Sequence, residues 1–365
     1  MSIPTTQKAL LLHEAGMPYV LGESPVYHPG PEEVLVKIMA CALNPIDHMI
    51  ANPPYAQLFV TYWPFIAGYD GSGIVVEVGS QVRNLKEGDK VLFLGDGTNA
   101  KRSSTFQQYA VVPADLTAII PDNITFEQAA TLPLAITTDV LVLYNQSAAA
   151  ENIGLRLTPV WEPEGATAYA GTPAFIIGGA SSLGQYAIQL AKLAGHNPIV
   201  TTASLHNAPL LISLGATHVI DRHKSNESVL AELSTIAGEK SVEFVFVAIP
   251  HDPEVCRLGR DALAPGGALA IVLPSPYAIP EDVANAGDGK RVGFVYGSTY
   301  LPHTREVSVA MYRQLTSWLQ KGALKPNPVE VLPNGLAGIP EGLERMKANK
   351  ISGRKLVARP QETPC

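Results

Sequence analysis

The chain has 365 residues, a formal net charge of −7 and only 16% charged residues. An acidic chain without basic runs excludes nucleic-acid binding as the main function, because that needs clustered cations. Hydrophobic residues make up 46% of the sequence, enough for one or two buried cores, which excludes disorder as the main state.

The sequence gives no sign of membrane insertion or export. No apolar run approaches the roughly 18 residues that span a bilayer. The N-terminal apolar stretch is too short for a signal peptide, because Glu14 interrupts it. Three widely separated cysteines suggest neither a disulfide framework nor a zinc cluster. We therefore expect a cytoplasmic protein without membrane association.

The first third of the chain predicts a β-rich domain. Runs of β-branched residues bounded by Gly and Pro are typical of strands, and four occur, at Glu33–Ala40, Gly73–Val78, Lys90–Leu94 and Tyr109–Val112. Short strands with close turns favour a distorted antiparallel sheet or barrel. A helix is then expected from Phe126, with Thr125 as its N-cap and Gln128 completing a capping box.

After an irregular excursion at 145–172, strand and helix patterns alternate. The predicted strands are Ala174–Ile177, Pro198–Thr202, His218–Ile220, Val242–Ile249 and Gly267–Leu273. Helices are expected at Ser182–Ala194, around Leu210, at Ser228–Ile236 and near Pro253–Leu263. This alternation predicts a doubly wound domain, a parallel sheet covered on both faces. A helix near Val307–Leu319 and strands at Pro328–Leu332 and Lys355–Ala358 return the chain to the first domain.

A glycine-rich turn joins the first strand of this doubly wound domain to its helix. Gly179, Ser181 and Gly184 occupy the three positions of G-x-G-x-x-G, with serine in the second. The amides at the start of the helix, those of Ser182 and Leu183 included, and its positive dipole end would hold a pyrophosphate. The sequence therefore predicts a dinucleotide site; an ordinary tight strand–helix turn is the alternative.

The choice of nicotinamide cofactor depends on the end of the second strand. NAD-binding domains carry Asp or Glu about 20 residues after the glycine loop, and here that position is Ser204. Without a carboxylate, a 2′-phosphate meets no repulsion. Ser204, His206 and Asn207 offer hydrogen bonds to it, and Arg222 adds a charge. NADPH is the expected cofactor, unless these are ordinary polar loop residues.

Together these motifs resemble the medium-chain dehydrogenase/reductase superfamily. The shared motifs occur in the family's order, as ALNPIDH at 42–48, GYDGSGIVVEVG at 68–79, VRNLKEGDKV at 82–91, FQQYAVVPADLTAIIPDNITFEQAATLP at 106–133, the glycine loop, and LGATHVID at 214–221. The resemblance implies a GroES-like domain at 1–140 and 311–365, and a Rossmann domain at 141–310.

The resemblance also implies that the catalytic zinc of one family branch is missing. The first cysteine ligand of that branch falls at Asn44, and its His–Glu pair is here Tyr69–Asp70. Its third ligand, a cysteine just ahead of the glycine loop, has no counterpart. A Lewis-acid site needs three protein ligands, so no metal is expected.

Among the zinc-free branches, the excursion and the residues SLHN at 204–207 resemble fungal trans-acting enoyl reductases of polyketide synthases. This implies an NADPH-dependent reduction of an α,β-unsaturated acyl thioester, carried by a synthase or by CoA, in secondary metabolism. A quinone or enone reductase is one alternative. A non-reductive NADPH-binding protein is another, because Met49 stands where many trans-acting members have lysine. The family includes monomers and homodimers, and the sequence does not decide between them.

Enoyl reduction needs hydride at the β-carbon and a proton at the α-carbon. The spacing of Tyr55 from Asn44 is similar to that in mitochondrial-type enoyl thioester reductases, which implies that Tyr55 donates the proton. Packing within a loop is the alternative for this tyrosine. His48, which titrates near neutrality, is a second catalytic candidate at the expected cleft.

The remaining candidates are placed by family position. Thr137 and Thr138 lie where the family places residues beside the nicotinamide carboxamide, and Thr138 is also a catalytic candidate. The alternative is that these hydroxyls bond to the backbone of their own helix. Asn44, Met49 and Tyr300 are expected to line the substrate pocket.

Overall fold

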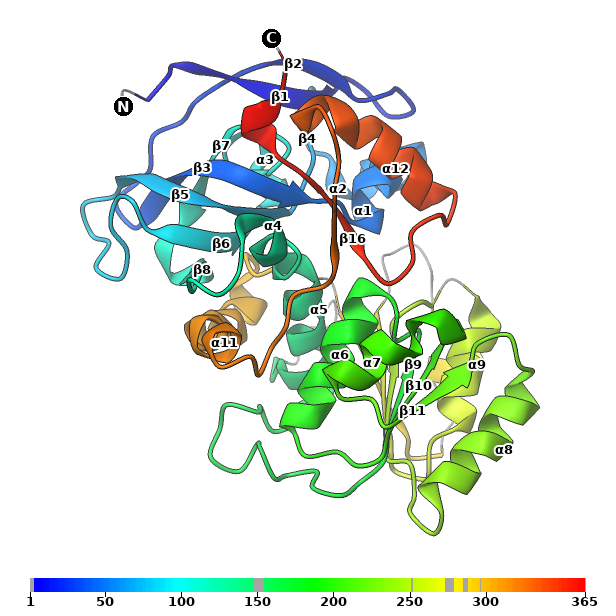
Figure 1. The fold of residues 1–365 in the computed structure, drawn as a ribbon. Helices are drawn as coiled ribbons and strands as arrows, with labels where there is room; N and C mark the ends of the chain where they lie inside the picture. The colour runs from blue at the N-terminus through cyan, green and yellow to red at the C-terminus, as the bar shows by residue number, and fades with distance from the viewer. Residues whose placement is uncertain are drawn as a thin grey trace. The chain divides into compact units, whose positions relative to one another are not determined.

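The computed structural model describes residues 3–147, 154–250, 252–272, 279–284, 288–295 and 297–364. The chain forms two compact units (Figure 1). Unit 1 comprises Met1–Leu134, Val309–Gly322 and Pro326–Cys365, and unit 2 comprises Ala135–Ser308 and Ala323–Lys325. The chain therefore leaves unit 1, builds unit 2, and returns to complete unit 1.

Unit 1 is built on a seven-stranded sheet in which β3 is central. β3 pairs with β5 on one side and with β7 and β16 on the other, all antiparallel. The strands are β3 (Glu33–Ala42), β5 (Asp70–Val78), β6 (Lys90–Leu94), β7 (Tyr109–Pro113), β8 (Thr117–Ile119), β15 (Val329–Val331) and β16 (Lys355–Ala358). A second sheet holds β1 (Thr6–Leu12), β2 (Val20–Pro25) and β4 (Phe65–Ile66). The β-rich fold predicted for the first domain is confirmed.

Short helices accompany these sheets. They are α1 (Pro45–Met49), α2 (Pro53–Phe59), α3 (Ala100–Ser103), α4 (Phe126–Ala129) and α12 (Ile339–Lys347). α4 begins with the predicted capping box, in which the Gln128 amide donates to the Thr125 hydroxyl and the Gln128 side chain accepts from the Thr125 amide. α4 ends after one turn, and a new helix, α5 (Pro133–Tyr144), begins at a proline, whose fixed φ suits the first position of a helix.

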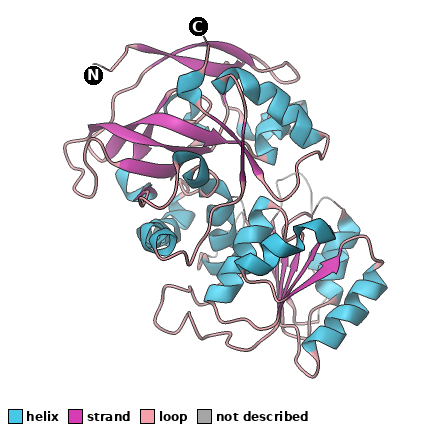
Figure 2. Ribbon diagram, viewed as in Figure 1, coloured by secondary structure: helices cyan, strands magenta, loops and turns pink. Residues whose placement is uncertain are grey.

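Unit 2 is a parallel sheet with helices on both sides of its strands (Figure 2). The strand order is β11-β10-β9-β12-β13-β14, so the order reverses between β9 and β12. The strands are β9 (Ala174–Ile177), β10 (Ile199–Ala203), β11 (His218–Asp221), β12 (Phe244–Val247), β13 (Ala268–Ile271) and β14 (Arg291–Phe294). The helices are α6 (Ser182–Leu193), α7 (Ala208–Leu214), α8 (Asn226–Ala237), α9 (Pro253–Asp261) and α10 (Glu281–Ala284), and α11 (Pro302–Gln320) leads back to unit 1. The predicted doubly wound Rossmann architecture is confirmed.

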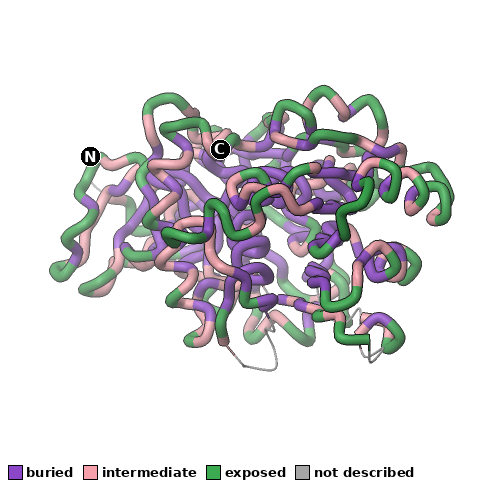
Figure 3. Tube along the Cα trace, turned by 90° about the horizontal axis from the view of Figure 1, so that it is seen from below, coloured by how far each residue is buried: buried purple, intermediate pink, exposed green. Residues whose placement is uncertain are grey.

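Each unit has its own apolar core, seen as the purple interior of the tube in Figure 3. Contrary to the expectation from the sequence, one stretch, Phe126–Tyr144, is long and apolar enough to cross a membrane by length and composition alone, but 78% of its apolar window is buried inside the protein. That degree of burial is typical of a core helix.

An aromatic stack in unit 2 contains a buried histidine. The His196 ring stacks on Tyr169 and Phe244, with ring centroids 5.2 and 5.3 Å away, and its Nδ1 atom lies 3.1 Å from the carbonyl oxygen of Thr172. Burial lowers the pKa of His196 from 6.5 to about 4. The unfolded chain therefore takes up this proton first as the pH falls.

We expect the stability of the protein to fall between pH 6.5 and 4 through His196, by up to about 3 kcal/mol. A His196→Phe variant keeps an aromatic ring in the stack and should lack this loss. Urea unfolding of both proteins at pH 7.5 and 5 measures the difference. Buried Asp47, whose pKa is raised to about 8, acts in the opposite direction, but it cancels when the two proteins are compared at one pH. Equal pH dependence in both proteins would contradict the expectation.

Candidate functional site

In unit 1, the predicted site residues lie on two consecutive short helices. Asn44 ends the loop after β3 and caps α1, which starts with a proline and carries His48 and Met49. Asn44 and Met49 are buried, and His48 is half-buried. The Asn52 side chain donates to the His48 carbonyl at 3.1 Å and so links α1 to α2. Tyr55, on α2, is 8% exposed. The structure thus places Tyr55 on a helix and not in a loop.

Asp47 holds the turn before α1 together. Its Oδ2 atom accepts the Asn44 backbone N–H at 2.7 Å, and its carbonyl accepts the Tyr19 hydroxyl at 2.7 Å. Burial raises the pKa of Asp47 to about 8, and the nearby Asp70 carboxylate adds to the rise, against the lowering effects of the Asn44 N–H and of Lys355. The backbone position of Asn44 is therefore fixed by a buried carboxyl group.

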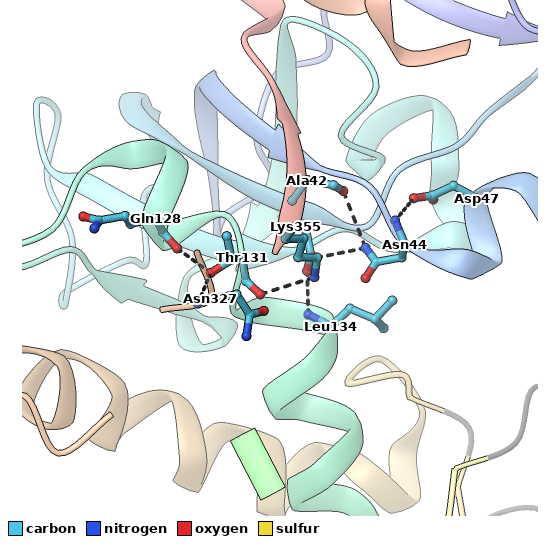
Figure 4. A network of polar contacts seen from close by, with 9 residues as sticks. Ala42, Asn44, Asp47, Gln128, Thr131, Leu134, Asn327 and Lys355 are labelled. Atoms are coloured by element: carbon cyan, nitrogen blue, oxygen red, sulfur yellow. Dashed lines mark hydrogen bonds and ion pairs between the residues drawn. The ribbon is translucent and has the colours of Figure 1, made fainter. Parts of the chain in front are cut away.

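Asp70, at the start of β5, is the centre of a polar network with Asn44, Leu134 and Lys355, and these three residues are labelled in Figure 4. The Asp70 carboxylate accepts the Asn44 side-chain amide at 2.9 Å and the Leu134 backbone N–H at 2.6 Å. The Lys355 ammonium lies 2.5 Å from the same carboxylate and donates to the Thr131 carbonyl at 3.2 Å. Both charged side chains are buried, at 0% and 4% exposure. Sequence reasoning saw Asp70 only as a replaced zinc ligand and missed Lys355.

The residues at the positions that hold zinc in one branch of the family, Asn44, Tyr69 and Asp70, do not form a zinc site here. Asn44 offers an amide, and Asp70 pairs with Lys355. Tyr69 offers a phenol and packs against Gly97. Within the described ranges, no group of three or more His, Cys, Asp or Glu side chains is arranged to hold a metal. An amide, a phenol and an ion-paired carboxylate do not fit zinc, which prefers Cys, His and unpaired carboxylate ligands.

In unit 2, the glycine loop between β9 and α6 packs too closely for side chains. A Cβ atom on Gly184 would lie 2.3 Å from the Gly178 carbonyl oxygen, and one on Gly179 would lie 2.1 Å from the Thr201 hydroxyl. Ser181 caps α6, because its hydroxyl accepts the Gly184 N–H at 3.0 Å and donates to the Gly178 carbonyl at 2.8 Å. Gly184 therefore provides space, while the amides of Ser182 and Leu183 start the helix.

This loop lies at the position where doubly wound sheets bind ligands. It follows β9 at its carboxyl end, and the strand order reverses between β9 and β12. Ligands of such sheets bind outside the carboxyl ends of the strands at this reversal, against the start of the helix. The glycine cradle, which any Cβ would fill, fits the pyrophosphate of a dinucleotide.

The predicted 2′-phosphate residues follow the two neighbouring strands. Ser204 comes after β10 and Arg222 after β11, and the Arg222 Nε donates to the Ser204 hydroxyl at 2.8 Å. Arg222 and His206 are exposed, whereas Asn207 is buried at the start of α7. The structure thus brings Ser204 and Arg222 together, with His206 two residues away in the chain.

Helix α5 carries the two threonines predicted beside the nicotinamide. Both are buried, and the Thr137 hydroxyl has no hydrogen-bond partner among the described residues. The bond to the helix backbone that the alternative requires is therefore not made by Thr137. Tyr300 is half-buried, and its backbone N–H donates to the Ser298 hydroxyl at 3.3 Å.

Asp139, two residues after Thr137, was not singled out by the sequence. Its carboxyl group is fully buried, and neither oxygen has a hydrogen-bond partner within the described residues. Burial raises the pKa of Asp139 well above its ordinary value. The feature of the sequence that could have revealed Asp139 is an acidic residue within the otherwise apolar pattern of α5.

Comparisons with known proteins agree with this description. Residues 30–122 match the family model of the alcohol dehydrogenase GroES-like domain, and residues 182–302 match that of the zinc-binding dehydrogenases. A trans-enoyl reductase of Gibberella fujikuroi is 30% identical, over 92% of this chain and 93% of its own length.

Solved structures show the same fold. The quinone oxidoreductase of Coxiella burnetii is 25% identical with a TM-score of 0.73, covering 96% of this chain and 98% of that one. The CurK enoyl reductase has a TM-score of 0.77 at 21% identity, covering 98% and 99%.

Proposed function

The chain belongs to the medium-chain dehydrogenase/reductase superfamily and is an oxidoreductase with a nicotinamide cofactor, and from this premise we propose that it is a zinc-independent, NADPH-dependent enoyl reductase. Its substrate would be an α,β-unsaturated acyl thioester, carried in trans by a polyketide synthase or by CoA. In this proposal residues 1–140 and 311–365 form the GroES-like substrate domain, residues 141–310 bind NADPH, and the protein acts in the cytoplasm.

The observation that carries the proposal is the pairing of two features in unit 2. A glycine cradle of dinucleotide type is followed, at the next strand end, by a serine–arginine pair where NAD enzymes place a carboxylate. The names of the fungal relatives supply the reaction class, because they include trans-enoyl reductases that match nearly the whole chain. The side chains of Asn44, Tyr69 and Asp70 are poor zinc ligands, which supports a zinc-independent reaction.

The roles of the residues follow from the chemistry of the reduction. Bound NADPH supplies the hydride for the β-carbon. The amides of Ser182 and Leu183 hold the pyrophosphate, and Thr137 and Thr138 hold the nicotinamide carboxamide. Tyr55 donates the proton to the α-carbon, as a positioned phenol can.

In this proposal the half-buried His48 hydrogen-bonds the thioester oxygen as negative charge develops on it. Asn44, Met49 and Tyr300 line the substrate pocket in this proposal. Met49 is buried and apolar where many trans-acting members have lysine, so it offers the acyl chain a hydrophobic contact.

Arg222 gives the cofactor choice a direct test. Its Nε already bonds to Ser204, so the rest of its exposed guanidinium is available for a 2′-phosphate. We expect Arg222→Gln to raise the KM for NADPH about 10- to 100-fold and to leave the KM for NADH unchanged. Lys224→Gln, which removes an exposed cation paired with Glu232, is the matched control and should change neither. Equal effects on NADPH and NADH would refute this assignment of Arg222.

The proposed reaction is tested by NADPH absorbance at about 340 nm with a short α,β-unsaturated pantetheine thioester. NADH in place of NADPH tests the cofactor, and a quinone or enone in place of the thioester tests the first alternative. Consumption with NADPH and thioester supports the proposal. Faster turnover of quinones would assign the protein to the quinone reductases. NADPH binding without turnover of any of these would favour a non-reductive function.

A further inference from the structure

Asp70 joins three segments of unit 1 that are distant in the sequence. Its carboxylate receives the side-chain amide of Asn44, the backbone N–H of Leu134 and the ammonium of Lys355. These donors come from the loop after β3, the start of α5 and the start of β16. All three side chains involved, those of Asp70, Asn44 and Lys355, are buried.

The contact with Leu134 acts as a helix cap supplied by a distant strand. The first amides of a helix lack acceptors within the helix, and Leu134 is the second residue of α5, after Pro133. The Asp70 carboxylate satisfies its N–H and places a negative charge at the positive end of the helix dipole. The position at which α5 begins is therefore tied to β5.

Lys355 holds the same turn from the other side. Besides pairing with Asp70, its ammonium donates to the carbonyl of Thr131, three residues before Leu134. The Thr131 hydroxyl accepts the N–H of Asn327 at 3.1 Å. The turn between α4 and α5 is thus fixed at both ends by buried polar contacts, seen together in Figure 4.

Thr137 and Thr138 follow Leu134 by three and four residues, so they lie on the same face of α5 as the capped residue. We propose that Asp70 and Lys355 are positioning residues, which orient the Asn44 carboxamide and fix the start of α5, the helix that carries the two threonines proposed to hold the nicotinamide. This inference rests on the proposed function. If the Asp70–Lys355 pair only stabilised the fold, its removal would not change how the cofactor binds, whereas the proposal predicts that it does.

The test compares two ligands of the NADPH site by calorimetry. NADP⁺ contains the nicotinamide, whereas adenosine 2′,5′-bisphosphate contains only the adenosine end. The Asp70→Leu/Lys355→Met double variant removes both charges, so that neither is left buried alone. We expect it to bind NADP⁺ about tenfold more weakly and the bisphosphate unchanged. Weaker binding of both ligands, or of neither, by a folded variant would overturn the proposal.

Two further variants keep the test decisive. Asp70→Asn/Lys355→Met retains an oxygen that can accept the Leu134 N–H, so NADP⁺ affinity should return toward that of the wild type. If the leucine variant does not fold, Asp70→Ala/Lys355→Met, which also lacks the acceptor, replaces it, and equal NADP⁺ affinity of the alanine and asparagine variants overturns the proposal. The control variant Glu127→Leu/Arg359→Met removes a different ion pair, between Glu127 on α4 and Arg359 near the C-terminus. It should leave the affinities for NADP⁺ and for the bisphosphate unchanged.

Activity separates this inference from the proposed function. If the wild type fails to reduce any enoyl thioester, the function is wrong, yet the calorimetric comparison still decides the role of Asp70. If the wild type is active, the leucine variant should lower kcat more than it raises the KM for the thioester. Loss of stability with unchanged kcat would show that the pair is structural only.

Discussion

Replacing Tyr55 with phenylalanine is expected to lower kcat for an enoyl thioester by about 100-fold or more, because a positioned general acid contributes that much or more to such reactions. Tyr55 is 8% exposed and sits on α2, directly after the helix that carries His48 and Met49. The substitution removes one oxygen and keeps the ring, so packing is preserved. Hydride transfer at the β-carbon does not involve the phenol, so the KM for NADPH should remain unchanged.

Tyr62→Phe is the matched control for this variant. Tyr62 is also in unit 1, and its hydroxyl accepts the backbone N–H of Lys101 at 2.6 Å, so the change removes a structural hydrogen bond outside the proposed site. We expect it to lower stability slightly and to leave kcat intact. Steady-state rates of both variants should be measured beside unfolding curves. A kcat for Tyr55→Phe within twofold of the wild type would mean that another group delivers the proton.

Replacing Gly184 with valine should abolish NADPH binding. Even the Cβ atom would meet the Gly178 carbonyl oxygen at 2.3 Å and the Gly179 Cα at 2.6 Å, and both are backbone atoms that cannot move aside without opening the loop. The start of α6 must shift away from the position that receives the pyrophosphate. We expect a loss of affinity of about 100-fold or more for NADPH and NADH alike, since both share that group.

Gly238→Ala separates this effect from the general cost of replacing glycine. Gly238 ends α8 in the same unit with a φ of +64°, and nothing lies within 4 Å of the added Cβ. The control should lower stability by about 1–3 kcal/mol through backbone strain alone. Its NADPH affinity should match the wild type in a calorimetric titration. A folded Gly184→Val protein that binds NADPH normally would remove the glycine loop from the cofactor site.

Several strands could be predicted to the residue from the sequence. β6, β9 and β16 have the expected bounds, because each is an apolar run bounded by polar residues, prolines or glycines. The hairpin of β1 and β2 was not predicted, since most of β2 is exposed and contains glycine, glutamate and proline. β14 was also missed, as a short edge strand that is only partly buried. Edge strands have only a weak alternation of apolar residues, so they are recognised from their hydrogen bonds to a neighbouring strand and not from the sequence.

Candidate site residues could be singled out from the sequence where they are close together in the chain. The glycine loop and the segment from Asn44 to Tyr55 each lie in one stretch, but the two short helices of that segment were not predicted. The pairing of Asp70 with Lys355 was not predictable, because 285 residues separate them and neither has a local pattern. Its existence depends on β16 returning to pair with β3, which only the folded sheet reveals.

The most direct test of the proposed function follows the hydrogen atoms. The protein is incubated with NADPH deuterated at the transferred C4 position and an α,β-unsaturated pantetheine thioester in ordinary water, and the product is analysed by mass spectrometry and NMR. The account predicts a saturated thioester with one deuterium at the β-carbon and none at the α-carbon. An unlabelled or unreduced thioester, with NADPH bound, would contradict the assignment of this chain as an enoyl reductase.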